Sequence, residues 1–95
     1  MQYEELRQAL EILALPERAS LGEIKARHRD LVKRYHPDAG GGDPERIRQI
    51  NAAYRLLSAY CRDYRFAFTR EEFLEQNPEE RLRQQFASDT IWGGL

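Results

Sequence analysis

The residues best suited to chemistry are three consecutive ones, His36, Pro37 and Asp38. An imidazole and a carboxylate are the side chains of acid–base catalysis, and proline fixes the backbone between them. The sequence places no Ser or Cys nucleophile beside them, so it does not favour a catalytic pair. Taken alone, the tripeptide indicates the end of a helix followed by a turn.

Metal and nucleotide binding are also not favoured. His28, His36 and Cys61 carry the only imidazole and thiol groups, and a cysteine on a helix is more often a small hydrophobic residue than a ligand. A lone cysteine excludes an internal disulfide and a cysteine-based zinc finger. The glycine run 40–42 lacks the Gly-Lys-Ser/Thr ending of a phosphate-binding loop. We therefore expect neither a metal nor a cofactor.

Basic side chains gather on the segment that leads to the tripeptide. Residues 23–34 carry a net charge of +3, whereas the whole chain carries -1. Spacings of four put Lys25, Arg29 and Lys33 on one face of a helix, and Arg34 follows them. Such a face is either an ordinary solvated surface or one that steers an acidic partner.

Two helices are predicted to hold the tripeptide between them. Ser20 and Glu23 form a capping box. The helix that follows should end at Tyr35, because the next residue, His36, precedes a proline and is therefore disfavoured in the helical region. Asp43 and Pro44 mark the start of the next helix. Each helix has apolar or aromatic residues at steps of three and four: Leu21, Ile24, His28, Leu31 and Tyr35, then Ile47, Ile50, Tyr54, Leu57 and Cys61. Matching apolar faces and a short loop predict an antiparallel hairpin over 20–35 and 44–62.

The rest of the chain should add shorter helices. A first helix is predicted from Tyr3 to Leu15, stopped by Pro16 and lying across the hairpin. After residue 62, an alternating pattern around Phe66 suits a short extended segment, and capping patterns at Thr69 and Asn77 predict two helix starts. We expect this tail, with its late residues Ile91, Trp92 and Leu95, to pack on the hairpin, because long exposed apolar stretches are uncommon on monomers. Truncation after Ser58 should then lower the melting temperature.

Length and composition narrow the function. The 95 residues suffice for one domain, and at this size a binding or regulatory module is favoured over an enzyme. No apolar run exceeds the four residues 12–15, so we expect no membrane span, and the first residues do not look like a secretory signal. We expect a monomer in the reducing cytoplasm.

Residues 3–58 resemble a J domain, the helper module of the DnaJ family of co-chaperones. The resemblance is carried by the His36-Pro37-Asp38 tripeptide, the pattern of residues 24–35 and the pattern of residues 47–58, which occur in that order. It implies an all-α fold, with the J domain over 1–62 and a private helical extension over 63–95.

The resemblance also implies a function. J domains bind DnaK-type ATPase chaperones and stimulate their ATP hydrolysis, so the protein would not itself be an enzyme. His36, Pro37 and Asp38 match the family's required loop, and the Asp38 carboxylate is suited to a charge-assisted bond with an arginine of the partner. The basic face would dock on an acidic chaperone surface through Lys25, Arg29, Lys33 and Arg34.

Three positions depart from the family pattern, and two alternatives stay open. Ala14 stands where glycine is usual, His28 where an aromatic is usual, and Asp30 where a basic residue is common. The first alternative is a small helical nucleic-acid-binding domain that uses the basic helix, although the loop is long for a helix-turn-helix. The second is a J-like scaffold without ATPase stimulation. The extension is also a candidate for binding a further protein.

Overall fold

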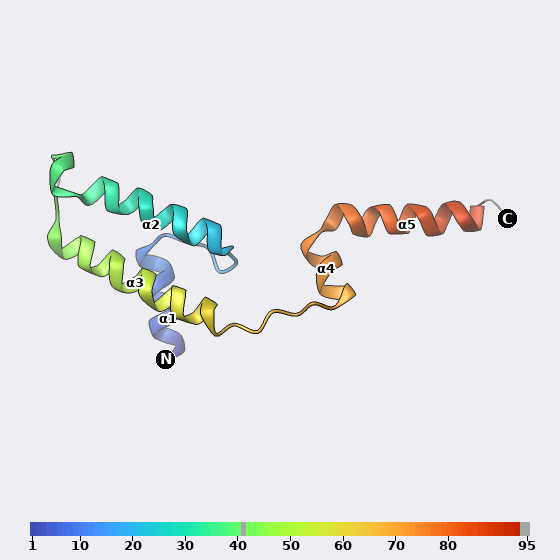
Figure 1. Ribbon diagram of the computed structural model, residues 1–95, viewed down its shortest axis with the longest axis horizontal. Coiled ribbons are helices and arrows are strands. Elements are labelled where there is room, and N and C mark those ends of the chain that lie inside the picture. Colours follow the sequence, from blue (N-terminus) through green and yellow to red (C-terminus); the bar gives the residue numbers. More distant parts are fainter. Residues whose placement is uncertain (41, 94–95) are drawn as a thin grey trace. The chain divides into compact units, whose positions relative to one another are not determined.

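The computed structural model describes residues 1–40 and 42–93, with the side chains of all of them except 39 and 88–93. Their regular elements are all helical: α1 (Tyr3–Ile12), α2 (Leu21–Tyr35), the short 3-10 helix η1 (Pro37–Ala39), α3 (Pro44–Arg62), α4 (Arg70–Gln76) and α5 (Pro78–Gly93) (Figure 1). The predicted all-α class is confirmed. The chain divides into two compact units, Met1–Tyr64 and the residues from Arg65 onward.

The predicted starts of the hairpin helices are confirmed by their caps. At the start of α2, the Ser20 hydroxyl accepts from the Glu23 N–H and the Glu23 carboxylate accepts from the Ser20 N–H, both at 3.1 Å. At the start of α3, the Asp43 carboxylate accepts from the Arg46 N–H, also at 3.1 Å. These bonds satisfy backbone donors that have no partner inside the helix. Helix α2 ends at Tyr35 and α3 at Arg62, as the sequence predicts.

The core of the first unit lies where α1 and α2 pack on α3 (Figure 1). Its buried apolar residues are Ala9, Leu13, Ile24, Leu31, Ile50, Ala53 and Leu57. Spacings of three, four and seven residues place the buried side chains of each helix on one face. The predicted face of α2 begins one turn later than expected, because Leu21 is 46% exposed.

The first helix ends earlier than predicted. Residues 13–15 leave the helix before Pro16 is reached, since α1 stops at Ile12. The Ala14 N–H donates to the Glu11 carbonyl (3.0 Å) and the Leu15 N–H to the Leu10 carbonyl (2.9 Å). This pair of bonds is the Schellman motif, which needs a left-handed residue, and Ala14 has φ 53°. The chain thus turns at the position where the family pattern has glycine, and Pro16 is not what stops it.

The second unit is built from α4 and α5, which pack on each other. Helix α4 begins as predicted, with the Thr69 hydroxyl accepting from the Glu72 N–H at 3.2 Å. Helix α5 begins after Asn77, whose side chain donates to the Phe73 carbonyl (2.8 Å) and so caps the end of α4. The segment before α4, around Phe66, has neither helix nor strand among these described residues, and the short extended segment expected there stays a prediction.

Several expectations about the tail stay predictions. The side chains of Ile91 and Trp92 lie outside the described ones, as does Leu95 altogether. Packing of residues 63–95 on the hairpin, and the domain boundary at 62, are also untested expectations. Within the described part of the chain, no helix combines the length and the apolar character that crossing a bilayer requires.

Candidate partner-binding site

The predicted tripeptide forms a tight turn at the tip of the α2–α3 hairpin (Figure 1). His36 has extended backbone (φ −70°, ψ 140°), as its place before proline requires, and Pro37 opens η1. The Asp38 N–H donates to His36 Nδ1 at 3.2 Å. Gly40, with φ 82°, closes the turn by donating its N–H to the Pro37 carbonyl at 3.3 Å. The His36 imidazole therefore stabilises the turn by accepting this hydrogen bond at Nδ1.

The turn presents its carboxylate to solvent. The Asp38 side chain is 93% exposed and the His36 side chain 51% exposed. Nδ1 of His36 lies 3.6 Å from Oδ2 of Asp38, and within the described residues no Lys or Arg pairs with this carboxylate. Because an exposed carboxylate keeps its hydrogen-bonding capacity, Asp38 is free to accept from a cationic partner.

Two contacts join the ends of the loop that carries the turn. The Asp43 N–H, just before α3, donates to the carbonyl of Tyr35, the last residue of α2, at 3.1 Å. One turn into α3, the Arg46 guanidinium lies over the Tyr35 ring, 5.1 Å from its centroid. A cation–π contact of this kind stabilises by about 0.5–1 kcal/mol at an exposed site. These two contacts hold the last residue of α2 beside the first turn of α3. The residues between them therefore form a loop that extends beyond the ends of the two helices.

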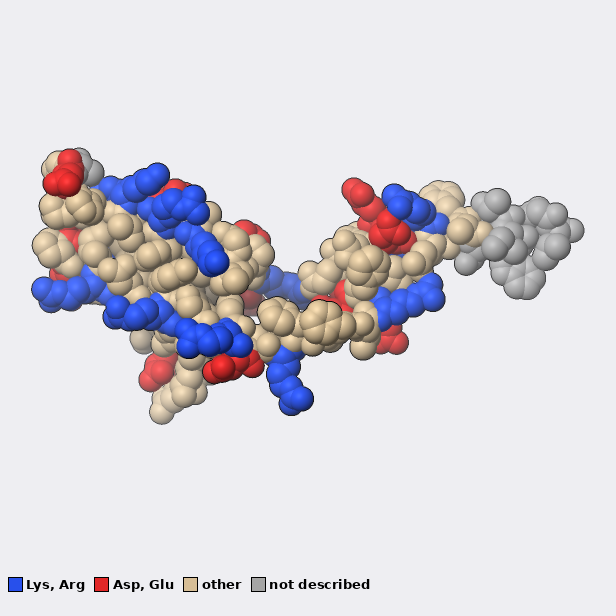
Figure 2. All heavy atoms as spheres, in the orientation of Figure 1, with Lys and Arg blue, Asp and Glu red and all other residues tan. Residues whose placement is uncertain are grey.

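The four predicted basic residues lie on the surface of α2. Lys25, Arg29, Lys33 and Arg34 are all exposed. Among the residues that the structure describes, none of the four pairs with a carboxylate. Figure 2 shows Lys and Arg side chains gathered over α2. Their positive charge is thus available to an acidic surface, and it continues to the end of the helix that carries the turn.

The fifth basic residue of this helix has a structural role that the sequence did not reveal. Arg27 is half-buried, and its Nε–H donates to the Leu13 carbonyl at 2.9 Å. Leu13 is the C-cap of α1, where carbonyls lack helical partners, so the bond ties α2 to the end of α1. A long-range partner of this kind carries no local sequence signal.

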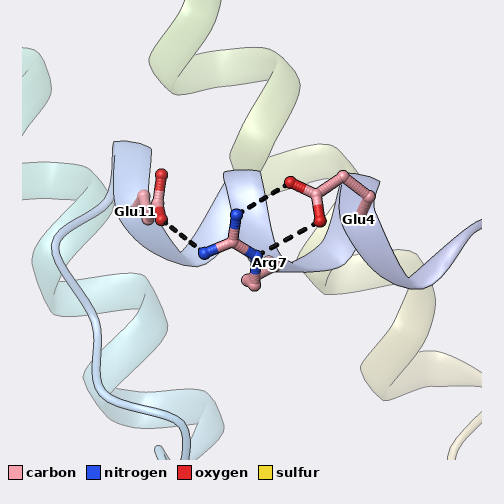
Figure 3. A network of polar contacts seen from close by, with 3 residues as sticks. All are labelled: Glu4, Arg7 and Glu11. Atoms are coloured by element: carbon pink, nitrogen blue, oxygen red, sulfur yellow. Dashed lines mark hydrogen bonds and ion pairs between the residues drawn. The ribbon is translucent and has the colours of Figure 1, made fainter.

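Helix α1 offers a contrast, because its basic residue is already paired. Arg7 donates to Glu4 and to Glu11, each at 2.9 Å, within one exposed network (Figure 3). Hydrogen bonding and charge attraction from Arg7 lower the pKa of Glu4. The same contact with Glu4 raises the pKa of Arg7. Of these two helices, it is therefore α2 that presents basic side chains without a carboxylate partner among the described residues.

His28 lies inside the hairpin, in the role of an aromatic residue. Its ring is stacked on Tyr54 of α3, and its Nε2–H donates to Asn51 Oδ1 at 2.9 Å. The departure from the family pattern at this position therefore preserves an aromatic contact. Among the described residues, no group of three or more His, Cys, Asp or Glu side chains is arranged to hold a metal ion.

The fold and the site together define a small helical interaction module, with an exposed turn at the tip of a hairpin and a basic helix leading to it. Residues 8–63 match the DnaJ domain, which is more than half of the chain. The chain therefore belongs to the DnaJ domain family, and the resemblance found in the sequence is confirmed.

Curated relatives share this part of the chain. An uncharacterized 19.0 kDa protein from Sinorhizobium is 49% identical over 58 residues, covering 56% of this chain and 34% of its own. The chaperone protein DnaJ of Caldicellulosiruptor saccharolyticus is 47% identical over 51 residues, covering 50% and 13%. A DnaJ-like protein from Mycoplasma pneumoniae is 44% identical over 48 residues, covering 50% and 16%.

These matches concern one domain. The aligned part covers about a third or less of the length of the curated relatives named here. No solved structure matches the fold of the chain.

Proposed function

We propose that this protein is a co-chaperone that binds a DnaK-type chaperone and stimulates its ATP hydrolysis. The observation that carries the proposal is the exposed His36-Pro37-Asp38 turn, held at the tip of the hairpin in a chain of the DnaJ domain family. Relatives named chaperone protein DnaJ support a co-chaperone role.

The proposal divides the work between two surfaces. The unpaired basic residues of α2 steer and hold an acidic surface of the chaperone, and the turn makes the contact that matters for hydrolysis. Asp38 is suited to accept from an arginine there, since charge-assisted hydrogen bonds are about twice as strong as neutral ones. The reaction takes place in the partner, so the protein needs no catalytic group of its own.

Single-turnover ATP hydrolysis by a DnaK chaperone tests the turn. The native protein should raise the hydrolysis rate. Asp38→Asn should abolish the increase, because the amide removes the charge and adds a donor where the partner arginine also donates. Asp30→Asn is the matched control: it removes one exposed carboxylate from α2 and should leave the stimulation in place. Helical circular dichroism should be the same for all three proteins.

The basic face is tested by charge reversal. Arg29→Glu should lower the apparent affinity for DnaK. It should also make that affinity depend less on salt concentration, since the lost interaction is electrostatic. Arg55→Glu makes the same change on an exposed residue of α3 and should have little effect.

Two results would contradict the proposal. A folded native protein that does not stimulate hydrolysis by DnaK would indicate a J-like scaffold. Salt-dependent retention on DNA near physiological ionic strength, without stimulation, would favour the nucleic-acid-binding alternative.

A further inference from the structure

Gly42 and Asp43 form the return arm of the loop, which leads into α3. Gly42 lies directly against Pro37 of the turn. A Cβ atom added to Gly42 would be 2.5 Å from the Cα of Pro37, 3.0 Å from its N and 3.2 Å from its Cβ. Real Cβ atoms essentially never come within 3.0 Å of such an atom, and ordinary contact begins at 3.4 Å. A side chain at residue 42 therefore requires a shift of about 0.5 Å, and one of about 0.9 Å for ordinary contact. Hydrogen is the only side chain that this approach accommodates.

The close approach is imposed by the neighbouring residue. Asp43 follows Gly42 and is bonded to both helices of the hairpin. Its N–H donates to the carbonyl of Tyr35 at the end of α2, and its side chain caps the start of α3. With Asp43 fixed beside Tyr35, the preceding residue must cross over Pro37. A side chain at residue 42 would therefore either break the hydrogen bond between the Asp43 N–H and the Tyr35 carbonyl or displace the turn.

Gly42 differs in kind from Gly22 and Gly40. Gly40 is needed for its conformation, with φ 82°, and a Cβ there would meet nothing within 4 Å. Gly22, on the exposed side of α2, would bring a Cβ only to 3.8 Å from the Ser20 hydroxyl. Of these three glycines, Gly42 is the one at which an added Cβ would collide with the turn.

We infer that Gly42 is a positioning residue for the His36-Pro37-Asp38 turn: it lets the return arm pack on Pro37 and so fixes the direction in which Asp38 projects. The inference rests on the proposed function for its consequence and on the Gly42–Pro37 approach for its geometry. A misplacement of about 1 Å in a positioned group can lower a rate by up to about 100-fold. A side chain at residue 42 should therefore reduce chaperone stimulation, although its nearest contacts are with Pro37 and not with the side chains of His36 or Asp38.

The experiment compares Gly42→Ala with Gly22→Ala, which adds the same methyl group where there is room. We expect single-turnover stimulation of DnaK to fall about tenfold or more in Gly42→Ala and to be retained in Gly22→Ala. In NMR spectra, the Asp38 amide should shift in Gly42→Ala while the amides of Ile50 and Leu57 in the core do not. The native protein should show a nuclear Overhauser effect between the α-protons of Gly42 and Pro37.

The outcomes separate this inference from the proposed function. Full stimulation by Gly42→Ala, or an absent Overhauser effect in the native protein, would overturn the positioning role. Should the native protein fail to stimulate DnaK, the proposed function is refuted, and the two NMR measurements alone then decide whether Gly42 sets the turn. The Overhauser effect is measured on the native protein, so it tests the positioning role even if Gly42→Ala does not fold.

Discussion

The imidazole of His28 on α2 is stacked on the phenol ring of Tyr54 on α3, with the ring centroids 4.0 Å apart and the planes inclined by 8°. The Nε2–H of the same imidazole donates to Asn51 Oδ1, one turn before Tyr54. A single side chain thus gives the hairpin both an aromatic contact and a hydrogen bond at half-buried positions.

The two contributions of His28 can be separated by substitution. His28→Ala should lower the free energy of unfolding by about 1–3 kcal/mol, because it loses the stacking and the hydrogen bond. His28→Phe keeps a ring for Tyr54 and should lose only about 1 kcal/mol. Urea unfolding followed by circular dichroism measures both, with Asn51→Ala as the control that removes the bond alone. Equal losses in the Ala and Phe variants would show that the stacking contributes nothing.

Ala14 should be a site where glycine stabilises the protein. The left-handed conformation costs an alanine about 1–2 kcal/mol, while glycine loses about 0.5–1 kcal/mol of backbone entropy on folding. Ala14→Gly should therefore raise the free energy of unfolding by about 0.5–1 kcal/mol. Ala26→Gly makes the same change on an exposed, helical residue of α2 and should lower it by about 1 kcal/mol. A decrease in both variants would mean that Ala14 is not strained in solution.

The cap of α2 should make stability depend on pH. Hydrogen bonds from the backbone and the side chain of Ser20 lower the pKa of Glu23 below its ordinary value of 4.5. A lowered pKa in the folded state means that the carboxylate stabilises the fold above pH 4.5, and that this stabilisation is lost as the pH falls through the folded-state pKa.

Glu23→Gln tests this dependence, since glutamine preserves the capping box without titrating. The advantage of the native protein over the variant should be constant at neutral pH and shrink below pH 4.5. Glu4, whose pKa Arg7 lowers, titrates in the same direction in both proteins, so the comparison isolates Glu23. Thermal melts across this range measure the difference. A difference that does not change with pH would contradict the prediction, and Glu17→Gln controls for the loss of one negative charge.

Asp30 should weaken the attraction between α2 and an acidic partner. It is exposed on the basic helix, where the family commonly has a basic residue. Asp30→Lys should raise the association rate with DnaK several-fold at low salt, and the gain should diminish as salt is added. The new lysine lies four residues before Arg34, so like-charge repulsion should lower the free energy of unfolding by about 0.2–0.5 kcal/mol.

Stopped-flow binding at several salt concentrations measures the effect of Asp30→Lys. Asp63→Lys changes the charge by the same amount after α3 and should leave the association rate nearly unchanged. Equal rates for Asp30→Lys and the native protein would show that the basic face does not steer the encounter.

Much of the hairpin could be predicted because its boundaries have local causes. Ser20, Tyr35 and Asp43 each mark a helix end through residues within three positions, and those ends agree with the structure. The turn at the tripeptide also has a local cause, since Pro37 restricts the backbone of the residue before it. The end of α1 was predicted wrongly because the usual glycine signal is absent, and Ala14 adopts the left-handed conformation without it.

The contacts that support the site could not be predicted, because they join residues far apart in the chain. Nothing in the local sequence distinguishes Arg27 from the other basic residues of α2, because its bond goes to the Leu13 carbonyl, 14 residues away. The cation–π contact of Arg46 with Tyr35 and the approach of Gly42 to Pro37 likewise depend on how the hairpin closes. No periodicity or local motif encodes these relationships.

The tie between Tyr35 and Asp43 has a consequence for the energetics of binding. A loop whose two ends are held together loses much of its conformational entropy when the protein folds, before any partner arrives. The remaining ordering penalty of association is then small, and a modest contact area is enough for a useful affinity. Such a module can dissociate quickly and still bind with useful affinity, because a low ordering penalty favours fast association.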